Sequence, residues 1–313
     1  MNSKEKLFVV TVVFNPRGFK SRFNLYRKFA PYVEYSGATL ITVEVAFNER
    51  PFEVTTPYNP HHLQLRTTAE LWHKERALNL GIAHLLKHYP EAKKVAWIDA
   101  DVKFSNDDWV KDTLLALDHY DVVQMYSEAQ NLNPKHERMW SANSLFSNYI
   151  NKVGFHQEPP IPLKYISGGH PGLAWAATIK ALNHLGGLLD VCVHGSGDTH
   201  MANALMGDVS LYTSEYLAAG LMNTYKEWAA KCDKFIKKNI GYINGICFHF
   251  WHGKSVQRGY EKRIDLICFH QFDPATDLLV DDNGLYKWAG NKPEMEYDLR
   301  LTMISRNEDS IDE

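Results

Sequence analysis

Hydrophobic runs and helical periodicities alternate along the first 130 residues of the chain. Short runs rich in β-branched and aromatic residues indicate buried strands, whereas apolar residues spaced three or four positions apart indicate helices. The order of these elements predicts an α/β fold with a central, mostly parallel sheet flanked by helices. The predicted strands are Leu7–Phe14, Thr39–Phe47, Lys93–Ile98 and Asp121–Tyr126, and the predicted helices are Phe19–Tyr35, a helix from Thr67 or Thr68 to just before Pro90, and Asp107–Leu117.

The pattern changes in the second half of the chain. Residues 132–164 show little periodicity and are predicted to be loop-rich, partly helical and a candidate mobile flap. The acidic end, Arg306–Glu313, is predicted to be disordered. The remaining predicted elements are a helix near Thr178–Leu185, a helix that starts after Asp198, an amphipathic helix with lysines on one face over Tyr225–Lys238, and a strand over Ile246–Phe250.

Two aspartates stand at the end of the third predicted strand, in the stretch VAWIDADVKF (Val95–Phe104). In an extended strand, residues i and i+2 point to the same side, so the carboxylates of Asp99 and Asp101 are expected to converge. Two anions held so close tolerate each other best beside a cation. The alternative is an ordinary strand end, where aspartate is common because its side chain bonds to the turn backbone.

Composition excludes few classes of protein. The chain has 313 residues, 45% of them hydrophobic, and a formal net charge of −3, so no global field marks it as a nucleic-acid or membrane-surface binder. The four cysteines form no C-x-x-C pair and are predicted to be reduced and structural. No apolar segment has the roughly 18 residues of a membrane span, and the N-terminal run is interpreted as a strand, not a signal peptide. A soluble, cytoplasmic protein without a membrane partner is expected.

Three further groups of residues carry candidate chemistry, each with a structural alternative. A helix bearing cations among apolar residues can bind an anionic ligand or simply face solvent. A carboxylate between small residues at a helix start can be a general base or an N-cap. Two histidines near a strand end can bind a metal or be structural. These groups are Lys74, Arg76 and Asn79 in HKERALNLGI, Asp198 in HGSGDTHMA, and His249 and His252 in FHFWHGK.

Taken together, the motifs resemble the glycosyltransferases of the GT-A fold, in particular the family-two-like enzymes and their relatives, including those of phages and bacteria. The resemblance covers most of the chain, through TVVFNP, HKERALNLGI, AWIDADV, GGHPGLAWA, GSGDTHMANAL and FHFWHGK. It implies a Rossmann-like nucleotide-diphospho-sugar transferase fold in a single catalytic domain, 1–313. A nucleotide-binding half, 1–130, would be followed by an acceptor-binding half, 131–305, and the acidic tail, 306–313.

The resemblance also assigns roles to individual residues. The D-x-D pair would hold Mn²⁺ or Mg²⁺ against the diphosphate of the donor, with Asp101 as direct ligand and Asp99 on the ribose or on the metal through water. A late histidine completes such sites, and His252 matches that position better than His249. The implied donor-binding residues are Phe14, Asn15, Pro16, Glu44, Lys74, Arg76, Asn79, Asp99, Lys254 and Arg258. Those implied to border the sugar and acceptor are Gly168, Gly169, His170 and Trp175.

The implied activity is transfer of a hexose or pentose from a nucleotide sugar, UDP-linked by expectation, to an acceptor hydroxyl. Asp198 stands where inverting members of the fold carry their general base. The chain departs from the family here, since Gly197-Asp198-Thr199 lacks the second acid of the E-D-D type motif, which leaves the stereochemistry open.

The acceptor and two rival functions remain open from sequence. The acceptor can be a glycan, a protein, a small molecule or a modified DNA base, for which the lysines of Tyr225–Lys238 would contact phosphates. A haloacid-dehalogenase-like phosphatase also places D-x-D after an apolar strand. In those enzymes the motif continues as D-x-D-x-T/V and usually follows the first strand, whereas this chain has Lys103 at the last position of that motif and nearly a hundred residues before the pair. A non-catalytic nucleotide-sugar-binding module is the third possibility.

Overall fold

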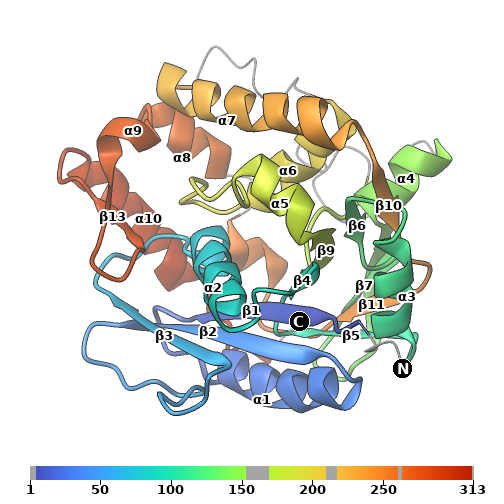
Figure 1. Cartoon of the computed structure of the whole chain (residues 1–313). Helices are drawn as coiled ribbons and strands as arrows, with labels where there is room; N and C mark the ends of the chain where they lie inside the picture. The colour runs from blue at the N-terminus through green and yellow to red at the C-terminus, as the bar shows by residue number, and fades with distance from the viewer. Residues whose placement is uncertain (1–4, 153–168, 209–216, 260–262, 312–313) are drawn as a thin grey trace.

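A seven-stranded sheet organises the computed structural model, which describes residues 5–152, 169–208, 217–259 and 263–311 (Figure 1). The strand order is β10-β6-β9-β4-β1-β2-β3, and every neighbouring pair is parallel except those of β9, which runs antiparallel to β4 and β6. The strands are β1 (Phe8–Phe14), β2 (Thr39–Phe47), β3 (His62–Thr67), β4 (Lys94–Ile98), β6 (Val122–Gln124), β9 (Ala174–Thr178) and β10 (Ile240–Tyr242). The predicted α/β fold with a mostly parallel central sheet is confirmed.

Helices cover both faces of this sheet because its central strands are apolar on both sides. In β1, Val10 belongs to one hydrophobic core and Val9 to the other, as the alternation of side chains in a strand requires. Helix α1 (Lys20–Tyr35) packs on one face and α2 (Lys74–His88) on the other (Figure 1). The sheet is therefore the middle layer of three.

A second, four-stranded sheet of order β5-β11-β7-β8 carries the late histidines to the aspartate pair. Strand β11 runs antiparallel to β5, the strand that follows Asp101 directly, and His249 pairs with Val102. The end of β11 therefore lies beside the aspartate turn. The strands are β5 (Val102–Phe104), β7 (Glu128–Leu132), β8 (Arg138–Asn143) and β11 (Ile246–His249).

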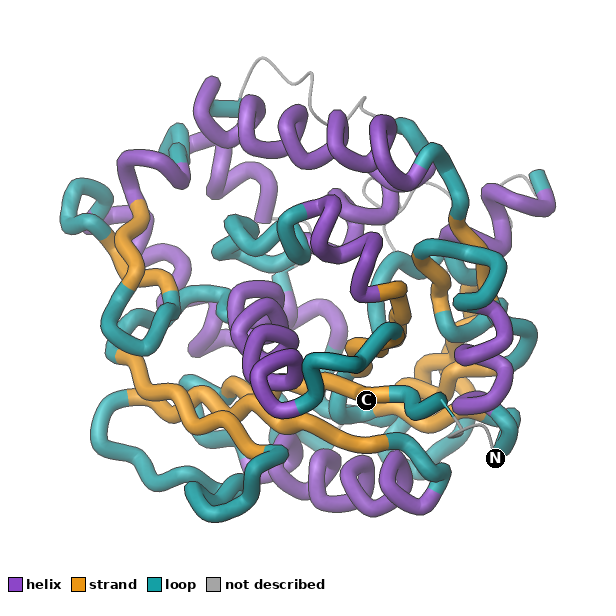
Figure 2. Tube along the Cα trace, in the orientation of Figure 1, coloured by secondary structure: helices purple, strands orange, loops and turns teal. Residues whose placement is uncertain are grey.

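The remaining elements surround these two sheets (Figure 2). A two-stranded sheet near the C-terminus consists of β12 (Leu278–Val280) and β13 (Tyr286–Trp288). The helices are α3 (Trp109–Ala116), α4 (Leu145–Asn151), α5 (Ile179–Leu185), α6 (Gly197–Met206), α7 (Ala219–Lys231), α8 (Arg263–Phe269), α9 (Pro274–Asp277) and α10 (Pro293–Ser305), with a π-helix over Cys232–Ile236 and a 3-10 helix over Ser255–Arg258.

Several predicted elements need correction. The helix predicted from Thr67 or Thr68 begins only at Lys74, because the preceding HLQLRT forms the edge strand β3 beside β2. The segment predicted to be loop-rich and partly helical does contain a helix, α4, but it also contains the strand β8, and its residues 153–164 lie outside the described part. The helix predicted from Tyr225 starts at Ala219 and continues into the π-helix.

The prediction of a disordered acidic tail is wrong for Arg306–Ile311. Glu308 is buried in the structure, and its neighbour Asp309 bonds to the start of α1. The charges that suggested disorder are instead compensated by partners almost 290 residues away in sequence.

Within the described ranges, no helix combines the length and the apolar character needed to cross a membrane. All four cysteines are free thiols, which agrees with the expected reduced state.

Candidate active site

Asp101, His249 and His252 come together at the junction of the two sheets. Asp101 follows β4, and the two histidines stand at the end of β11 and in the turn after it. The backbone N–H of Phe250 donates to the carbonyl of Asp101 at 2.9 Å, which ties the two loops to each other. All three side chains are buried.

The distances within this trio suit a divalent cation. His252 Nε2 lies 3.1 Å from His249 Nε2 and 3.2 Å from Asp101 Oδ2, and the third side of the triangle is 3.8 Å. Ligand atoms bound at about 2.1 Å and at right angles to each other lie about 3.0 Å apart. The other carboxylate oxygen of Asp101, Oδ1, is buried without a hydrogen-bond partner among the described residues. The residues present therefore fit a metal ion.

The protonation states of Asp101 and His252 also favour a metal. Burial, with the nearby charges of Arg258 and Arg22, lowers the pKa of His252 to about 3, so its ring is neutral near pH 7. Burial alone would raise the pKa of Asp101, but the charge of Arg22 and the imidazoles outweigh it and hold that pKa well below the usual range. A carboxylate and a neutral imidazole are both competent metal ligands.

Arg22 is a member of this site that the sequence did not reveal. Its guanidinium, from the first turn of α1, donates to Asp101 Oδ2 at 2.5 Å and lies 3.4 Å from the carboxylate of Glu308. Arg22 looks like an ordinary exposed helix residue in the sequence, and only the fold brings it to Asp101, 79 positions further along the chain. It holds the anionic charge of the site in place.

Asp99, the other member of the D-x-D pair, has a different partner. Its Oδ1 lies 2.6 Å from Nζ of Lys74 at the start of α2, outside the trio of candidate ligands. Among the predicted donor-binding residues the structure thus brings Lys74 and Asp99 together. The charges of Asp99 and then Asp198 outweigh burial and raise the pKa of Lys74 above its usual value.

Asp198 stands in the first turn of α6 and approaches the glycine loop that precedes β9. Its Oδ1 accepts a hydrogen bond from the N–H of Thr199 at 2.8 Å. A Cβ at Gly172 would lie only 2.5 Å from Asp198 Oδ2 and 3.6 Å from Cε1 of His170, so the absence of a side chain at Gly172 makes room for the carboxylate. The helix start and the loop therefore meet at Asp198.

Glu75 is a second residue that sequence reasoning missed. It looks like a first-turn acid that stabilises the helix dipole, but the side chain is buried against Gly197, whose Cβ would lie 2.8 Å from the Glu75 carboxyl carbon. Burial, reinforced by the charge of Asp198 and opposed by Lys74, raises the pKa of Glu75 to about 8. A neutral carboxyl group thus lies beside Lys74 and the start of α6.

The predicted nucleotide-binding residues at the end of β1 border a small cavity. Phe14, Asn15 and Pro16 line it from one side and the end of α10 from the other. The Asn15 side chain accepts from the N–H of Phe19 and donates to its carbonyl, which shapes the turn after β1. The full lining comprises Phe14, Asn15, Pro16, Arg17, Phe19, Arg22, Trp72, Met303, Arg306 and Glu308.

Glu44, predicted to contact the base, has a fully engaged carboxylate. It accepts hydrogen bonds from the N–H groups of Glu53, Val54 and Thr55 and from the Thr55 hydroxyl. The structure gives it an anchoring role for the loop after β2, and a contact with a base remains a prediction.

Arg76 and Asn79 also have structural partners away from the trio. The side chains of both donate to Asp190, and the Arg76 guanidinium lies 4.7 Å from the centre of the Tyr286 ring. These contacts fix α2 against the loop before α6 and against β13. Their roles in donor binding stay predictions.

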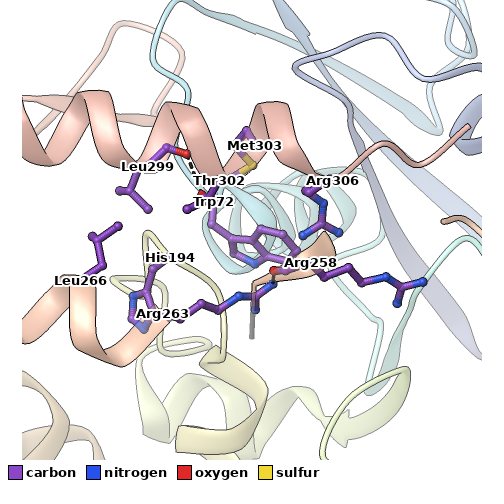
Figure 3. Close-up of a pocket in the computed structure, with 9 residues that line it drawn as sticks. All are labelled: Trp72, His194, Arg258, Arg263, Leu266, Leu299, Thr302, Met303 and Arg306. Carbon is purple, nitrogen blue, oxygen red and sulfur yellow. Dashed lines mark hydrogen bonds between the residues drawn. The ribbon is translucent and has the colours of Figure 1, made fainter. Parts of the chain in front are cut away.

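Arg258 lines a second cavity, which shares Trp72, Met303 and Arg306 with the first (Figure 3). The guanidinium groups of Arg263 and Arg306 each lie 5.2 Å from the Trp72 ring, so the indole has a cationic group on two sides. Arg258 donates to the carbonyl of Gly253, one residue after His252. The predicted phosphate-binding position is therefore near the trio, and Lys254, which is partly exposed, follows the same turn.

The residues predicted to border the sugar and acceptor lie in different environments, some in the loop before β9 and one in the hydrophobic core. His170 Nδ1 accepts from the N–H of Gly172, while Gly169 is buried in a backbone conformation with φ of 145°. Trp175 is in the middle of β9, where it stacks on Trp97 and belongs to the hydrophobic core. Gly168 lies outside the described residues.

Comparisons with known proteins give distant structural likeness only. No protein-family model matches the chain, and no curated protein matches it. Similar solved structures include a mannose-1-phosphate geranyltransferase from Thermus thermophilus, with 14% identity, coverage of 78% of this chain and 74% of that chain, and a TM-score of 0.35. A glycosyltransferase involved in glycosylation of the major capsid of PBCV-1 is 9% identical, with 94% and 99% coverage and a TM-score of 0.31.

A third similar structure is Drosophila beta-1,4-galactosyltransferase 7 in complex with manganese, UDP-Gal and xylobiose. It is 11% identical, with coverage of 63% of this chain and 59% of that chain, and a TM-score of 0.32. At these TM-scores the likeness does not decide the function, so the site's own geometry has to carry it.

Proposed function

We propose that this chain is a metal-dependent glycosyltransferase of the GT-A type that moves a sugar from a nucleoside-diphosphate donor, a UDP-sugar, to an acceptor hydroxyl. The observation that carries the proposal is the buried trio of Asp101, His249 and His252 at the carboxyl end of a central strand, with Asp198 on a neighbouring loop-to-helix junction. Ligands of α/β sheets bind at this edge.

In this proposal Asp101, His249 and His252 hold Mn²⁺ or Mg²⁺. A divalent ion there supplies Lewis-acid stabilisation of the negative charge on a departing nucleoside diphosphate. Lys74, 2.6 Å from Asp99, adds a positive charge at the same edge. Phe14, Asn15 and Pro16, which border the cavity after β1, would receive the nucleoside.

Asp198 is proposed as the general base for the acceptor hydroxyl, in an inverting reaction. The hydroxyl is a poor nucleophile until a carboxylate within hydrogen-bond reach accepts its proton. Asp198 Oδ2 points to the space that Gly172 leaves open, whereas Oδ1 is bonded to the backbone. Glu75 would be unsuitable as the base at neutral pH, since a pKa of about 8 keeps it protonated.

Calorimetric titration with UDP, with and without Mn²⁺, tests donor binding. We expect UDP to bind only with the metal and Asp101→Ala to abolish that binding. Asp107→Ala, on an exposed position after β5, is the matched control and should bind UDP as the parent chain does. UDP binding that is the same with and without Mn²⁺, and that Asp101→Ala leaves unchanged, would contradict the proposal.

A screen of nucleotide sugars for metal-dependent hydrolysis tests turnover without a known acceptor. Asp198→Asn should keep UDP binding and lower the rate of hydrolysis or transfer by about 10²–10⁴-fold, the usual contribution of a general base. UDP binding without turnover of any nucleotide sugar would instead indicate a binding module.

A further inference from the structure

The C-terminal segment Asn307–Ser310 is held between the start of α1 and the turn that carries His252. The Asp309 carboxylate accepts from the N–H groups of Lys20 at 3.0 Å and Ser21 at 2.7 Å. On the other side, the indole N–H of Trp251 donates to the carbonyl of Ser310 at 2.6 Å. The segment is therefore fixed at both of its edges.

The turn after β11 leaves no free space against this segment. Gly253 has φ of 87°, and a Cβ there would lie 2.8 Å from the carbonyl oxygen of Asn307 and 2.9 Å from Cα of Glu308. Backbone packed against backbone in this way sets the position of Glu308 relative to its neighbour His252. The approach is possible only with glycine.

Glu308 directs a buried carboxylate toward the site. Its side chain is 6% exposed, and one of its oxygens lies 3.4 Å from Arg22 Nε and 3.6 Å from His252 Nδ1. The other oxygen accepts from Arg306 Nε. His252 Nδ1 is buried and makes no hydrogen bond within the described residues, and the Glu308 carboxylate, 3.6 Å away, lies on the side where it would accept a hydrogen bond from Nδ1–H after a small approach.

The tautomers of the two histidines decide whether the trio can bind a metal. His249 Nδ1 lies 2.6 Å from Asn131 Oδ1, so Nδ1 carries the proton and Nε2 presents a lone pair to the site. His252 Nε2 must do the same to act as a ligand. If its proton were on Nε2, that N–H would donate to His249 Nε2 or Asp101 Oδ2, both within 3.2 Å, and would close the site.

We propose that Glu308 is a positioning residue for the metal site: its carboxylate keeps the proton of His252 on Nδ1 and so turns the Nε2 lone pair toward the ion. Asn131 does the same for His249. Such outer partners fix the ring orientation and tautomer of metal-bound histidines. The inference rests on the metal site of the proposed function, and it makes the C-terminal segment a part of that site.

The ¹⁵N chemical shifts of the His252 ring in the metal-free protein, assigned by comparison with His252→Gln, report the tautomer directly. We expect Nδ1–H in the parent chain and in Glu308→Gln, whose amide oxygen still accepts, and Nε2–H in Glu308→Ala. A merely structural contribution of Glu308 would leave the tautomer unchanged. Nε2–H in the parent chain, or no change in Glu308→Ala, overturns the proposal.

Mn²⁺ affinity, measured by calorimetry without nucleotide, gives a second readout. Glu308→Ala should lose about 10–100-fold, the usual effect of removing such a partner, and Glu308→Gln should lose less. Glu296→Ala, on the exposed side of α10, is the control and should bind Mn²⁺ as the parent does. An equal loss in both Glu308 variants would assign the effect to charge and contradict the proposal.

These measurements separate the inference from the proposed function, because neither uses a nucleotide. If the tautomer and affinity change as expected but no nucleoside diphosphate binds, the positioning role stands and the transferase proposal fails. If UDP binds only with Mn²⁺ while the Glu308 variants bind the metal normally, the transferase proposal stands and the positioning role fails.

A second variant, Glu308→Asp, withdraws the carboxylate by one methylene and replaces Glu308→Ala if that variant does not fold. It should show a partial loss of Mn²⁺ affinity. Unchanged affinity would refute the positioning role.

Discussion

At the scale of single residues, the chemistry of the site depends on partners that are far apart in sequence. The residue types Asp101, His252 and Asp198 could be selected from the sequence because strand ends and helix starts are places where carboxylates and imidazoles gather around ligands. Arg22 and Glu308 could not, since each becomes informative only through a contact with a residue at least 50 positions away. Local pattern carries no signal for such contacts.

The buried Glu75 leads to a prediction about pH. Its pKa is about 8 in the folded chain and near the ordinary 4.5 when unfolded. Between these values the unfolded state releases a proton that the folded state keeps, so the Glu75 contribution to the free energy of unfolding falls as pH rises from 4.5 to 8. Glu75→Gln does not titrate. We expect its stability relative to the parent to increase over this window, by on the order of 3 kcal/mol, and to level off above the folded-state pKa.

Urea denaturation of both proteins at about pH 5, 6.5 and 8, values that span the two pKa values, measures this difference. Glu49→Gln, at an exposed turn after β2, should show no such dependence on pH relative to the parent. A constant difference between Glu75→Gln and the parent across the window would mean that Glu75 is ionised in the folded protein.

At the scale of elements, the sequence predicts the buried strands β1, β2, β4 and β6 and the partly buried β11, but it misses the buried β9 and the edge strand β3. Strands β1, β2 and β4 are mostly apolar runs without polar alternation, as is typical of strands covered on both faces. The edge strand β3 mixes polar and apolar residues, so its pattern predicts a loop and a helix start instead. The tail Arg306–Ile311 has a composition that suggests solvation, whereas its charges are paired with α1 and with the turn after β11.

The contact between that turn and the tail can be tested with one methyl group. Gly253→Ala adds a Cβ that meets the backbone of Asn307 and Glu308, at a positive φ of 87°. Gly290→Ala is the matched control, since Gly290 has φ of 91° and nothing within 4 Å of the added Cβ. Both variants carry the conformational penalty of about 1–2 kcal/mol, and only the first carries the clash.

We therefore expect Gly253→Ala to lower the thermal midpoint more than Gly290→Ala does, and to make the chain beyond α10 more sensitive to limited proteolysis. Differential scanning fluorimetry and mass spectrometry of the fragments measure both effects. Equal midpoints for the two variants would show that the segment moves away from the added methyl group without loss of stability, and that its packing against the turn is loose.

At the scale of the whole molecule, the trio joins the two larger sheets. Asp101 belongs to the loop that leaves the seven-stranded sheet, and His249 belongs to β11 in the four-stranded sheet. An ion held by both would bind the folded chain and not the unfolded one, because unfolding separates ligands that lie 148 and 151 positions apart. Binding of this kind adds RT ln(1 + [L]/Kd) to the free energy of unfolding, about 2.7 kcal/mol at roughly 100 times Kd.

The thermal midpoint should accordingly rise with Mn²⁺ concentration, without any nucleotide, and continue to rise above the Kd measured by calorimetry. Asp101→Ala should abolish the shift, and Asp107→Ala should retain it. If Mn²⁺ binds tightly to the parent chain while its midpoint stays constant, the ion binds the folded and unfolded chains equally well. The site would then be a local cluster of ligands and not a link between the two sheets.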